Sequence, residues 1–164
     1  MKNKLICMVG LPYSGKSEYS RYMMDHNCGL AVVNPDSVRL AIHGQRFRIE
    51  SEPLVWANVS IMVRSLFSAG HHTVIVDATN VSKKRRVAWY YPNDWDLEFH
   101  VMNRTAEECI QQAQKENDLE IIPVIERMNK EFDLITKEEG GEIYTITRRD
   151  GAIGITYQIM RLSR

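Results

Sequence analysis

The sequence predicts an α/β fold: a doubly wound parallel sheet with helices on both faces and a C-terminal β-hairpin at the edge. Short apolar segments alternate with helix-like segments through residue 102, which is the order typical of a parallel sheet. A glycine-rich turn follows the first apolar segment, and an alternating pattern surrounds a turn signal near the C-terminus. The length of 164 residues fits a single domain spanning 1–164.

The predicted strands are short runs rich in Val, Ile and Leu. These runs are too short for helices, and a strand buried in a parallel sheet is apolar on both faces. The tail alternates on both sides of Asp150-Gly151, which is a strong hairpin signal. We therefore expect strands at residues 4–9, 30–33, 73–76 and 97–102, and a hairpin at about 142–161.

The predicted helices begin at residues that favour a helical N-terminus. Glu18 lies in the first turn of one helix, where the helix dipole favours an anion. Pro53 opens the longest helix, whose apolar residues recur at helical spacing. Thr105 and Glu108 match a capping box. The expected helices are residues 17–26, 36–43, 53–70, 82–90, 105–117 and a segment that follows Pro123.

Charge balance and cysteine content exclude several classes of protein. Lys plus Arg and Asp plus Glu number 21 each, which excludes a highly cationic nucleic-acid coat protein. Cys7, Cys28 and Cys109 are odd in number and far apart, so we expect reduced thiols and no disulfide-linked partner. No apolar run approaches the ~20 residues that span a bilayer. We expect a soluble, cytoplasmic protein with no membrane partner.

The strongest motif lies at residues 10–17, which match G-x-x-x-x-G-K-[ST] between a strand and a helix. The glycines let backbone N–H groups point into one concavity, and the helix N-terminus adds positive potential. Lys16 is expected to reach the β- and γ-phosphates of a nucleoside triphosphate, and the Ser17 hydroxyl to coordinate Mg²⁺. The predicted nucleotide-binding residues of this loop are Gly10, Leu11, Pro12, Tyr13, Ser14, Gly15, Lys16 and Ser17.

Two acids and an arginine follow the second and third strands. Ligands of an open α/β sheet sit beyond the carboxyl ends of the strands, so these side chains should converge near the γ-phosphate. Asp36 and Arg39 share a helical face. Either they accept a hydroxyl proton and bind the transferring group, or they are an N-cap and a solvated cation. Asp77 follows a valine-rich strand and is either an acid that supports Mg²⁺ or a helix cap.

These segments together resemble the P-loop kinase domain of bacteriophage-type polynucleotide 5′-hydroxyl kinases and of related small kinases. The motifs are GLPYSGKS, NPDSVR and VDATN with a basic helix after it, and the resemblance covers roughly residues 4–135. It implies a P-loop NTPase fold that uses ATP and Mg²⁺, with a nucleic-acid 5′ end as partner. It also implies that Asp36 is the general base, that Arg39 contacts acceptor and phosphate, and that Asp77 acts near the acceptor.

The lid region, about residues 103–122, departs from the family pattern. Relatives carry arginines there that clamp the donor phosphates, whereas residues 110–117 contain a single cation, Lys115. We therefore predict that Lys115 binds the nucleotide, with Arg104 and Arg127 as flanking alternatives. Lysine is a weaker bidentate phosphate clamp than arginine. Tyr13 stands where many relatives have glycine, which narrows the phosphate loop.

A run of cations follows the third strand. The residues from Lys83 to Arg86 form either a solvated helix face or a groove for a nucleic-acid backbone. On the second interpretation, Arg85 and Arg86 bind the acceptor together with Arg39 and Asp77.

The predicted reaction is transfer of the γ-phosphoryl group of ATP to a hydroxyl, most simply the 5′-OH of a polynucleotide. Arg46, Phe47 and Arg48 favour this acceptor, because an aromatic ring beside guanidinium groups suits single strands. The alternatives are a kinase of a nucleoside, sugar or antibiotic, an ATPase or nucleotide switch, and an ATP-binding module with little turnover.

Overall fold

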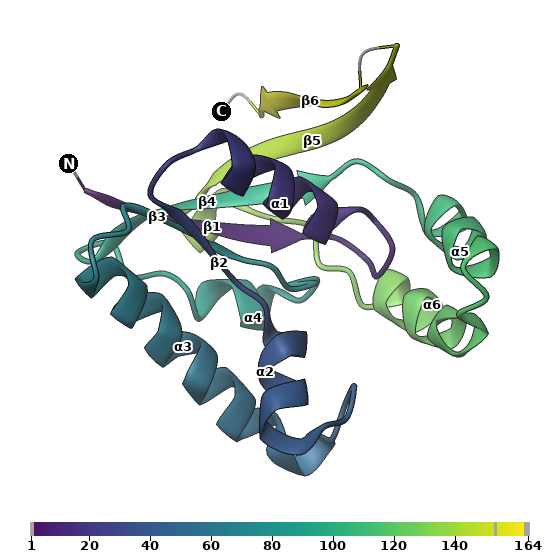
Figure 1. The fold of residues 1–164 in the computed structure, drawn as a ribbon, viewed down its shortest axis with the longest axis horizontal. Helices are drawn as coiled ribbons and strands as arrows, with labels where there is room; N and C mark the ends of the chain where they lie inside the picture. The colour runs from purple at the N-terminus through teal and green to yellow at the C-terminus, as the bar shows by residue number, and fades with distance from the viewer. Residues whose placement is uncertain (1, 153, 163–164) are drawn as a thin grey trace.

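A single sheet forms the centre of the computed structural model, which describes residues 2–152 and 154–162. The strand order is β2-β3-β1-β4-β5-β6 (Figure 1). The first five strands are parallel, and β6 is antiparallel to β5. The predicted doubly wound sheet is therefore confirmed. The strands are β1 (Asn3–Val9), β2 (Leu30–Val33), β3 (Thr73–Val76), β4 (Trp95–Met102), β5 (Glu142–Gly151) and β6 (Gly154–Arg161).

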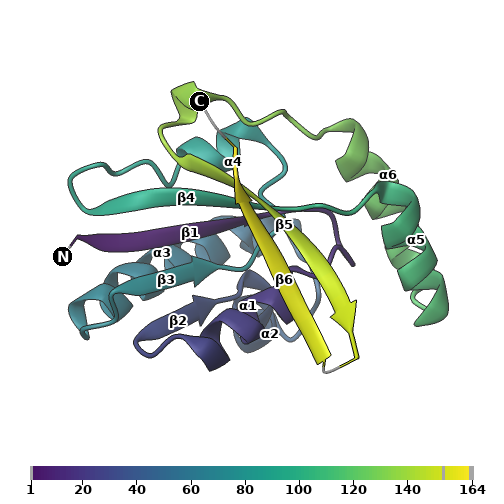
Figure 2. The same ribbon diagram turned by 90° about the horizontal axis from the view of Figure 1, so that it is seen from above.

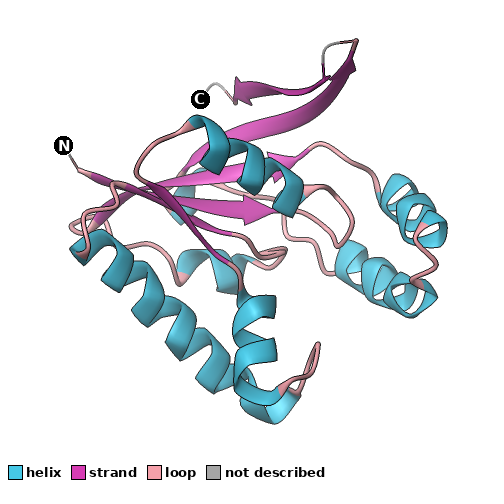
Figure 3. Cartoon of the chain, in the orientation of Figure 1, coloured by secondary structure: helices cyan, strands magenta, loops and turns pink. Residues whose placement is uncertain are grey.

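Helices connect the parallel strands, as Figure 3 shows. The Thr105–Glu108 capping box is present, because each residue accepts a backbone N–H of the other. The basic helix is shorter than the predicted 82–90, because Ser82 is its N-cap and the chain turns before Pro92. The helices are α1 (Lys16–His26), α2 (Pro35–His43), α3 (Glu52–Ser68), α4 (Lys83–Val87), α5 (Ala106–Lys115) and α6 (Ile122–Lys130).

The two faces of the sheet carry separate hydrophobic clusters. On one face, Leu5 and Cys7 of β1 belong to a buried cluster with Val55 and Val59 of α3. On the other face, Met8 of β1 packs in a cluster with Tyr19 of α1. Alternate residues of β1 therefore point to opposite layers, and burial on both faces explains why this strand is apolar throughout.

A third cluster lies at the carboxyl edge of the sheet. Leu11 of the phosphate loop and Val81 belong to a buried cluster with Cys109 and Ala113 of α5 and Ile125 of α6. Figure 1 shows α5 and α6 side by side beyond the carboxyl end of β1. Helices α5 and α6 therefore pack directly beside the phosphate loop.

The predicted hairpin is present, but its turn lies later than expected. Asp150 pairs with Ile155 and Gly151 with Gly154, so Asp150-Gly151 belongs to β5 and does not form the turn. The hairpin crosses the sheet edge beside α1, as the view from above shows (Figure 2). Tyr157 of β6 packs against Tyr19 and Tyr22, with ring centroids 5.0 Å apart in each pair. Contact with α1 therefore sets where the hairpin lies.

The described ranges contain no helix with both the length and the apolar composition needed to cross a bilayer. Cys7, Cys28 and Cys109 are free thiols, and the first and last of these are buried.

Candidate active site at the carboxyl edge of the sheet

The phosphate loop turns directly from β1 into α1. Tyr13 (φ 63°) and Gly15 (φ 95°) adopt left-handed backbone conformations. A Cβ on Gly10 would lie 2.6 Å from the Ser14 hydroxyl oxygen and 3.2 Å from Cβ of Met102, so a side chain there would force these neighbours to shift. No side chain caps the N-terminus of α1, which leaves its N–H groups available to an anion.

A backbone carbonyl of the phosphate loop holds the side chain of Lys16. Its Nζ donates to the carbonyl oxygen of Leu11 at 2.6 Å, and the residue is buried. Burial lowers the pKa of Lys16 to about 8, although the Asp77 carboxylate opposes this shift. The ammonium is therefore poised to exchange a carbonyl for phosphate oxygens.

Nucleotide binding is expected to take up a proton above about pH 8, because phosphate oxygens stabilise the charged form of Lys16 and raise its pKa from the value near 8 in the free protein. Between the free and bound pKa values the complex holds more protons, so ATP affinity falls as pH rises. Calorimetry at about pH 9 in two buffers of different ionisation enthalpy measures the uptake. The Lys16→Met variant should lose it, and buffer-independent enthalpies for the unmodified protein would contradict the assignment.

A cavity of about 720 Å³ opens beside the phosphate loop, and we call it the phosphate cavity. Its walls come from the phosphate loop, α1, α2, α3, the segment after β3 and the lid. The structure brings eight predicted site residues to this cavity: Pro12, Tyr13, Gly15, Lys16, Ser17, Asp36, Arg39 and Asp77.

Asp77 lies at the base of the phosphate cavity and is 5% exposed. Asn34 donates to its Oδ2 at 3.1 Å, whereas its Oδ1 is buried with no hydrogen-bond partner in the described chain. A buried unpartnered carboxylate oxygen needs a cation or a bound water. Asp77 and the Ser17 hydroxyl thus fit a Mg²⁺ ion that is held mainly by substrate phosphates.

The position of Arg39 depends on a residue that the sequence did not indicate. Glu52, the first residue of α3, accepts from Nε and Nη2 of Arg39 at 2.7 and 2.8 Å. Nη1 of Arg39 donates to Asp36 at 2.6 Å. The hydrogen bond with Arg39 lowers the pKa of Glu52. Trp56, also in α3, donates its ring N–H to Glu52 at 3.0 Å. Residues of α3 therefore fix the orientation of the Arg39 guanidinium.

Of the cations predicted in and beside the lid region, Arg127 lines the cavity and Lys115 does not. Lys115 is exposed at the last turn of α5 and is not part of the cavity wall. It follows the inward-facing Ala113 by two residues, about 200° around the helix, so it points away. Arg127 of α6 does line the cavity, and its side chain makes no hydrogen bond or ion pair within the described chain. In this structure Lys115 therefore does not line the cavity, whereas Arg127, one of the two flanking alternatives, does.

Tyr13 contacts the lid and does not obstruct the loop. Its hydroxyl donates to Asp118 at 2.9 Å, and Asp118 also pairs with Arg46 at 2.7 Å. Asp118 thus joins the phosphate loop to the loop after α2. Arg104 donates to the carbonyl oxygen of Tyr13 at 3.1 Å and supports the loop from the other side.

Of the two predicted acceptor contacts on α4, one is excluded. Arg86 is fully buried and pairs with Glu139 at 2.6 Å, so no acceptor can reach it. Arg85 is half-buried, and its guanidinium carbon lies 3.8 Å from the ring centroid of Trp56. Burial lowers the pKa of Arg85. Arg86 is therefore a structural residue, and Arg85 packs behind the cavity wall.

A second cavity of about 420 Å³ lies on the other side of the phosphate loop. Ser14 and Glu18 line one wall, and Arg148 and Tyr157 of the hairpin line the opposite wall. Arg148 pairs with Glu18 at 2.6 Å. The hydroxyl oxygens of Ser14 and Tyr157 are buried without a partner in the described chain. The sequence did not indicate this cavity, because hairpin and loop are about as far apart in the chain as its length allows.

Comparison with known proteins identifies the family. The sequence matches the AAA domain family over residues 5–120. No curated protein sequence matches it. A chain in a structure of a Pnkp1/Rnl/Hen1 complex is 30% identical, with a TM-score of 0.60 over 68% of this chain and 39% of that chain. A chain of the Pnkp1/Rnl/Hen1 RNA repair complex is 25% identical, with a TM-score of 0.62 over 80% of this chain and 47% of that chain.

The fold extends to kinases of lower sequence identity. The APS kinase CysC of Mycobacterium tuberculosis, solved with AMPPNP and APS, is 15% identical, with a TM-score of 0.63 over 89% of this chain and 88% of that chain. This chain spans less than half of each matched Pnkp1/Rnl/Hen1 chain. The family match includes the phosphate loop and the segments that carry Asp36 and Asp77. The chain therefore belongs to the AAA domain family and has the fold of a P-loop kinase.

Proposed function

We propose that the protein is an ATP- and Mg²⁺-dependent phosphotransferase that moves the γ-phosphoryl group to the 5′-OH of a polynucleotide. The main support is that a phosphate loop and an Asp–Arg pair line one cavity. Such a cavity can hold the donor phosphates at one end and an acceptor hydroxyl at the other. Positioning and charge stabilisation supply most of the rate in phosphoryl transfer.

Each charged residue of the phosphate cavity has a distinct role in this proposal. Lys16 binds the β- and γ-phosphate oxygens. Asp36 accepts the proton of the acceptor hydroxyl as that oxygen attacks phosphorus. Arg39, already fixed by Glu52, stabilises the charge on the transferring group. Mg²⁺ held near Ser17 and Asp77 would neutralise charge on the β- and γ-oxygens.

The second cavity suits the nucleoside of the donor. It adjoins the phosphate loop on the side opposite Asp36 and Arg39, as Gly15 lines both cavities. The unpartnered hydroxyls of Ser14 and Tyr157 offer hydrogen bonds to polar ligand atoms. The Arg148 guanidinium can stack on a base once it leaves Glu18.

Two features favour a nucleic-acid acceptor. Phe47 is 59% exposed at the cavity mouth, next to Arg46, which also lines the cavity. An exposed aromatic ring beside a guanidinium is the combination that holds single-stranded bases. The 30% identical chain comes from a Pnkp1/Rnl/Hen1 complex, and a similar assembly is described as an RNA repair complex. The likeness to the APS kinase, at 15% identity, supports only the fold.

An acceptor screen tests the proposal. Radiolabelled ATP and Mg²⁺ are offered with 5′-OH DNA and RNA oligonucleotides, nucleosides and sugars, and Lys16→Ala serves as the inactive control. Label on the oligonucleotide 5′ end supports the proposal. Label on a nucleoside or sugar alone indicates a small-molecule kinase, and phosphate release without an acceptor indicates an ATPase. ATP binding without phosphoryl transfer or hydrolysis would indicate a nucleotide-binding module.

Arg127→Ala is expected to lower kcat by ~10²-fold, whereas Lys115→Ala should leave it unchanged. The guanidinium of Arg127 lies at the phosphate cavity with no partner among the described residues, and Lys115 points away from the cavity. Steady-state kinetics with saturating acceptor distinguish the two variants. The reverse ranking would restore Lys115 as the lid cation.

A further inference from the structure

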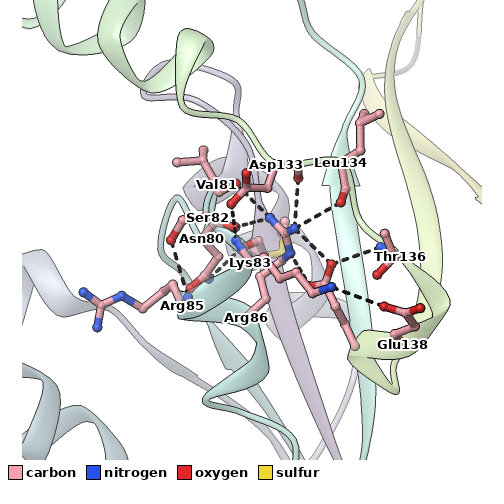
Figure 4. A network of polar contacts seen from close by, with 12 residues as sticks. Asn80, Val81, Ser82, Lys83, Arg85, Arg86, Asp133, Leu134, Thr136 and Glu138 are labelled. Atoms are coloured by element: carbon pink, nitrogen blue, oxygen red, sulfur yellow. Dashed lines mark hydrogen bonds and ion pairs between the residues drawn. The ribbon is translucent and has the colours of Figure 1, made fainter.

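Arg86 is a fully buried arginine that donates hydrogen bonds to backbone carbonyls of two separate segments of the chain. Its Nη1 donates to the carbonyl oxygens of Asn80 and Val81 at 3.1 and 2.8 Å. Its Nη2 donates to the carbonyl oxygens of Asp133 and Leu134 at 2.9 and 3.5 Å. Figure 4 shows the guanidinium between these two segments. One side chain thus satisfies four backbone acceptors.

The first segment, residues 77–81, begins with Asp77 and contacts the phosphate loop directly. The N–H of Gly10 donates to the carbonyl oxygen of Thr79 at 2.9 Å. Asn80, in a left-handed conformation (φ 44°), donates its side-chain amide to the carbonyl oxygen of Met8 at 2.8 Å. These contacts therefore tie the segment that carries Asp77 to Met8 and Gly10.

The second segment, residues 131–136, is where the chain leaves the lid helix α6. The N–H of Asp133 donates to the carbonyl oxygen of Val81 at 3.0 Å, and its carboxylate accepts the N–H of Lys83 at 2.7 Å. Thr136 donates its N–H to Glu139 at 3.0 Å. Residues 131–136 are therefore joined to residues 77–81 at several points, with Arg86 at the centre.

Glu139 holds the guanidinium in the orientation that these contacts need. Its oxygens accept from Nε of Arg86 at 2.6 Å and from Nη2 at 3.1 Å. A lysine would keep the charge but has a single nitrogen, which cannot reach carbonyls on both segments. An apolar residue would leave those buried carbonyls without donors. The planar fork of arginine is thus what the site requires.

We infer that Arg86 is a positioning residue that fixes Asp77 against the segment by which the chain returns from α6 to the sheet. The inference rests on the proposed phosphotransferase function, since it acts through Asp77. Arg86 itself lies outside the phosphate cavity and touches no substrate. A misplacement of about 1 Å at a reacting centre costs ~10²-fold in rate, so this contact network is expected to affect kcat.

A double-mutant cycle with Arg86→Lys and Asp77→Asn tests the inference. Kinase activity is measured well below the unfolding temperature of every variant. We expect Arg86→Lys to lower kcat by about 10-fold to 10²-fold with little change in the KM for ATP. On the Asp77→Asn background it should lower kcat by less than about threefold, because the residue it positions is already impaired.

Fold-changes that multiply in the double variant would overturn the inference, because Arg86 would then act independently of Asp77. Undiminished activity of Asp77→Asn would overturn both the inference and the role of Asp77 in the proposed function. No transfer to any acceptor by the unmodified protein would overturn the proposed function first. Val63→Ala, which removes buried volume on α3 away from the site, controls for destabilisation and should retain its kcat.

A second variant decides the matter if Arg86→Lys does not fold. The pair Arg86→Met with Glu139→Met removes both buried charges and keeps apolar volume, which commonly preserves folding. It leaves the carbonyls of both segments without the guanidinium. We expect a folded protein with the same loss of kcat, and a folded double variant with unchanged kcat would refute the positioning role.

Discussion

Replacement of Asp36 by Asn is expected to lower the rate of phosphoryl transfer by about 10²-fold to 10⁴-fold and to leave ATP binding intact. Asparagine is nearly isosteric with aspartate but cannot accept the hydroxyl proton. Asp36 lies in α2, outside the phosphate loop, so Lys16 and the N-terminus of α1 remain in place. Single-turnover transfer to a 5′-OH oligonucleotide measures the loss, and calorimetry with ATP and Mg²⁺ measures binding.

The geometry around Arg39 makes this variant informative. Arg39 keeps both hydrogen bonds to Glu52 when Asp36 is replaced, so the guanidinium should not move. A loss of rate would then report on the carboxylate of Asp36 itself. Asp25→Asn, an exposed change at the far end of α1, is the matched control and should be fully active. Unchanged transfer by Asp36→Asn would remove Asp36 as the general base.

Replacement of Glu139 by Ala is expected to lower the free energy of unfolding by about 3–5 kcal/mol. The change leaves the guanidinium of Arg86 buried and unpaired, because both partners are fully buried in the folded protein. The N–H of Thr136 also loses its acceptor. Urea unfolding followed by circular dichroism measures the difference.

A surface ion pair supplies the comparison for this stability prediction. Arg64 and Asp94 lie 2.7 Å apart, and their side chains are 49% and 42% exposed. Asp94→Ala should therefore cost at most about 1 kcal/mol, because solvent already screens that pair. If both variants lost the same free energy of unfolding, burial of the Arg86–Glu139 pair would contribute no additional stability.

Local sequence patterns determined the parts of the fold that depend on neighbouring residues. The apolar run of β1 and the glycines of residues 10–17 predicted a strand, a tight loop and a helix, because backbone sterics and helix capping act over a few residues. The order of these segments also predicted that Lys16, Asp36 and Asp77 would meet, since parallel strands end at one edge. The structure brings all three to the phosphate cavity.

Contacts between distant segments decided what the sequence could not. Glu52 holds Arg39 across 13 positions of the chain, and Arg86 reaches Glu139 across 53. No local pattern marks either pair, because their meeting depends on how α2 packs on α3 and how the chain returns from the lid. For the same reason Arg86 was misread as an acceptor contact. A basic run on a short helix specifies charge, whereas tertiary packing decides which of its side chains is buried.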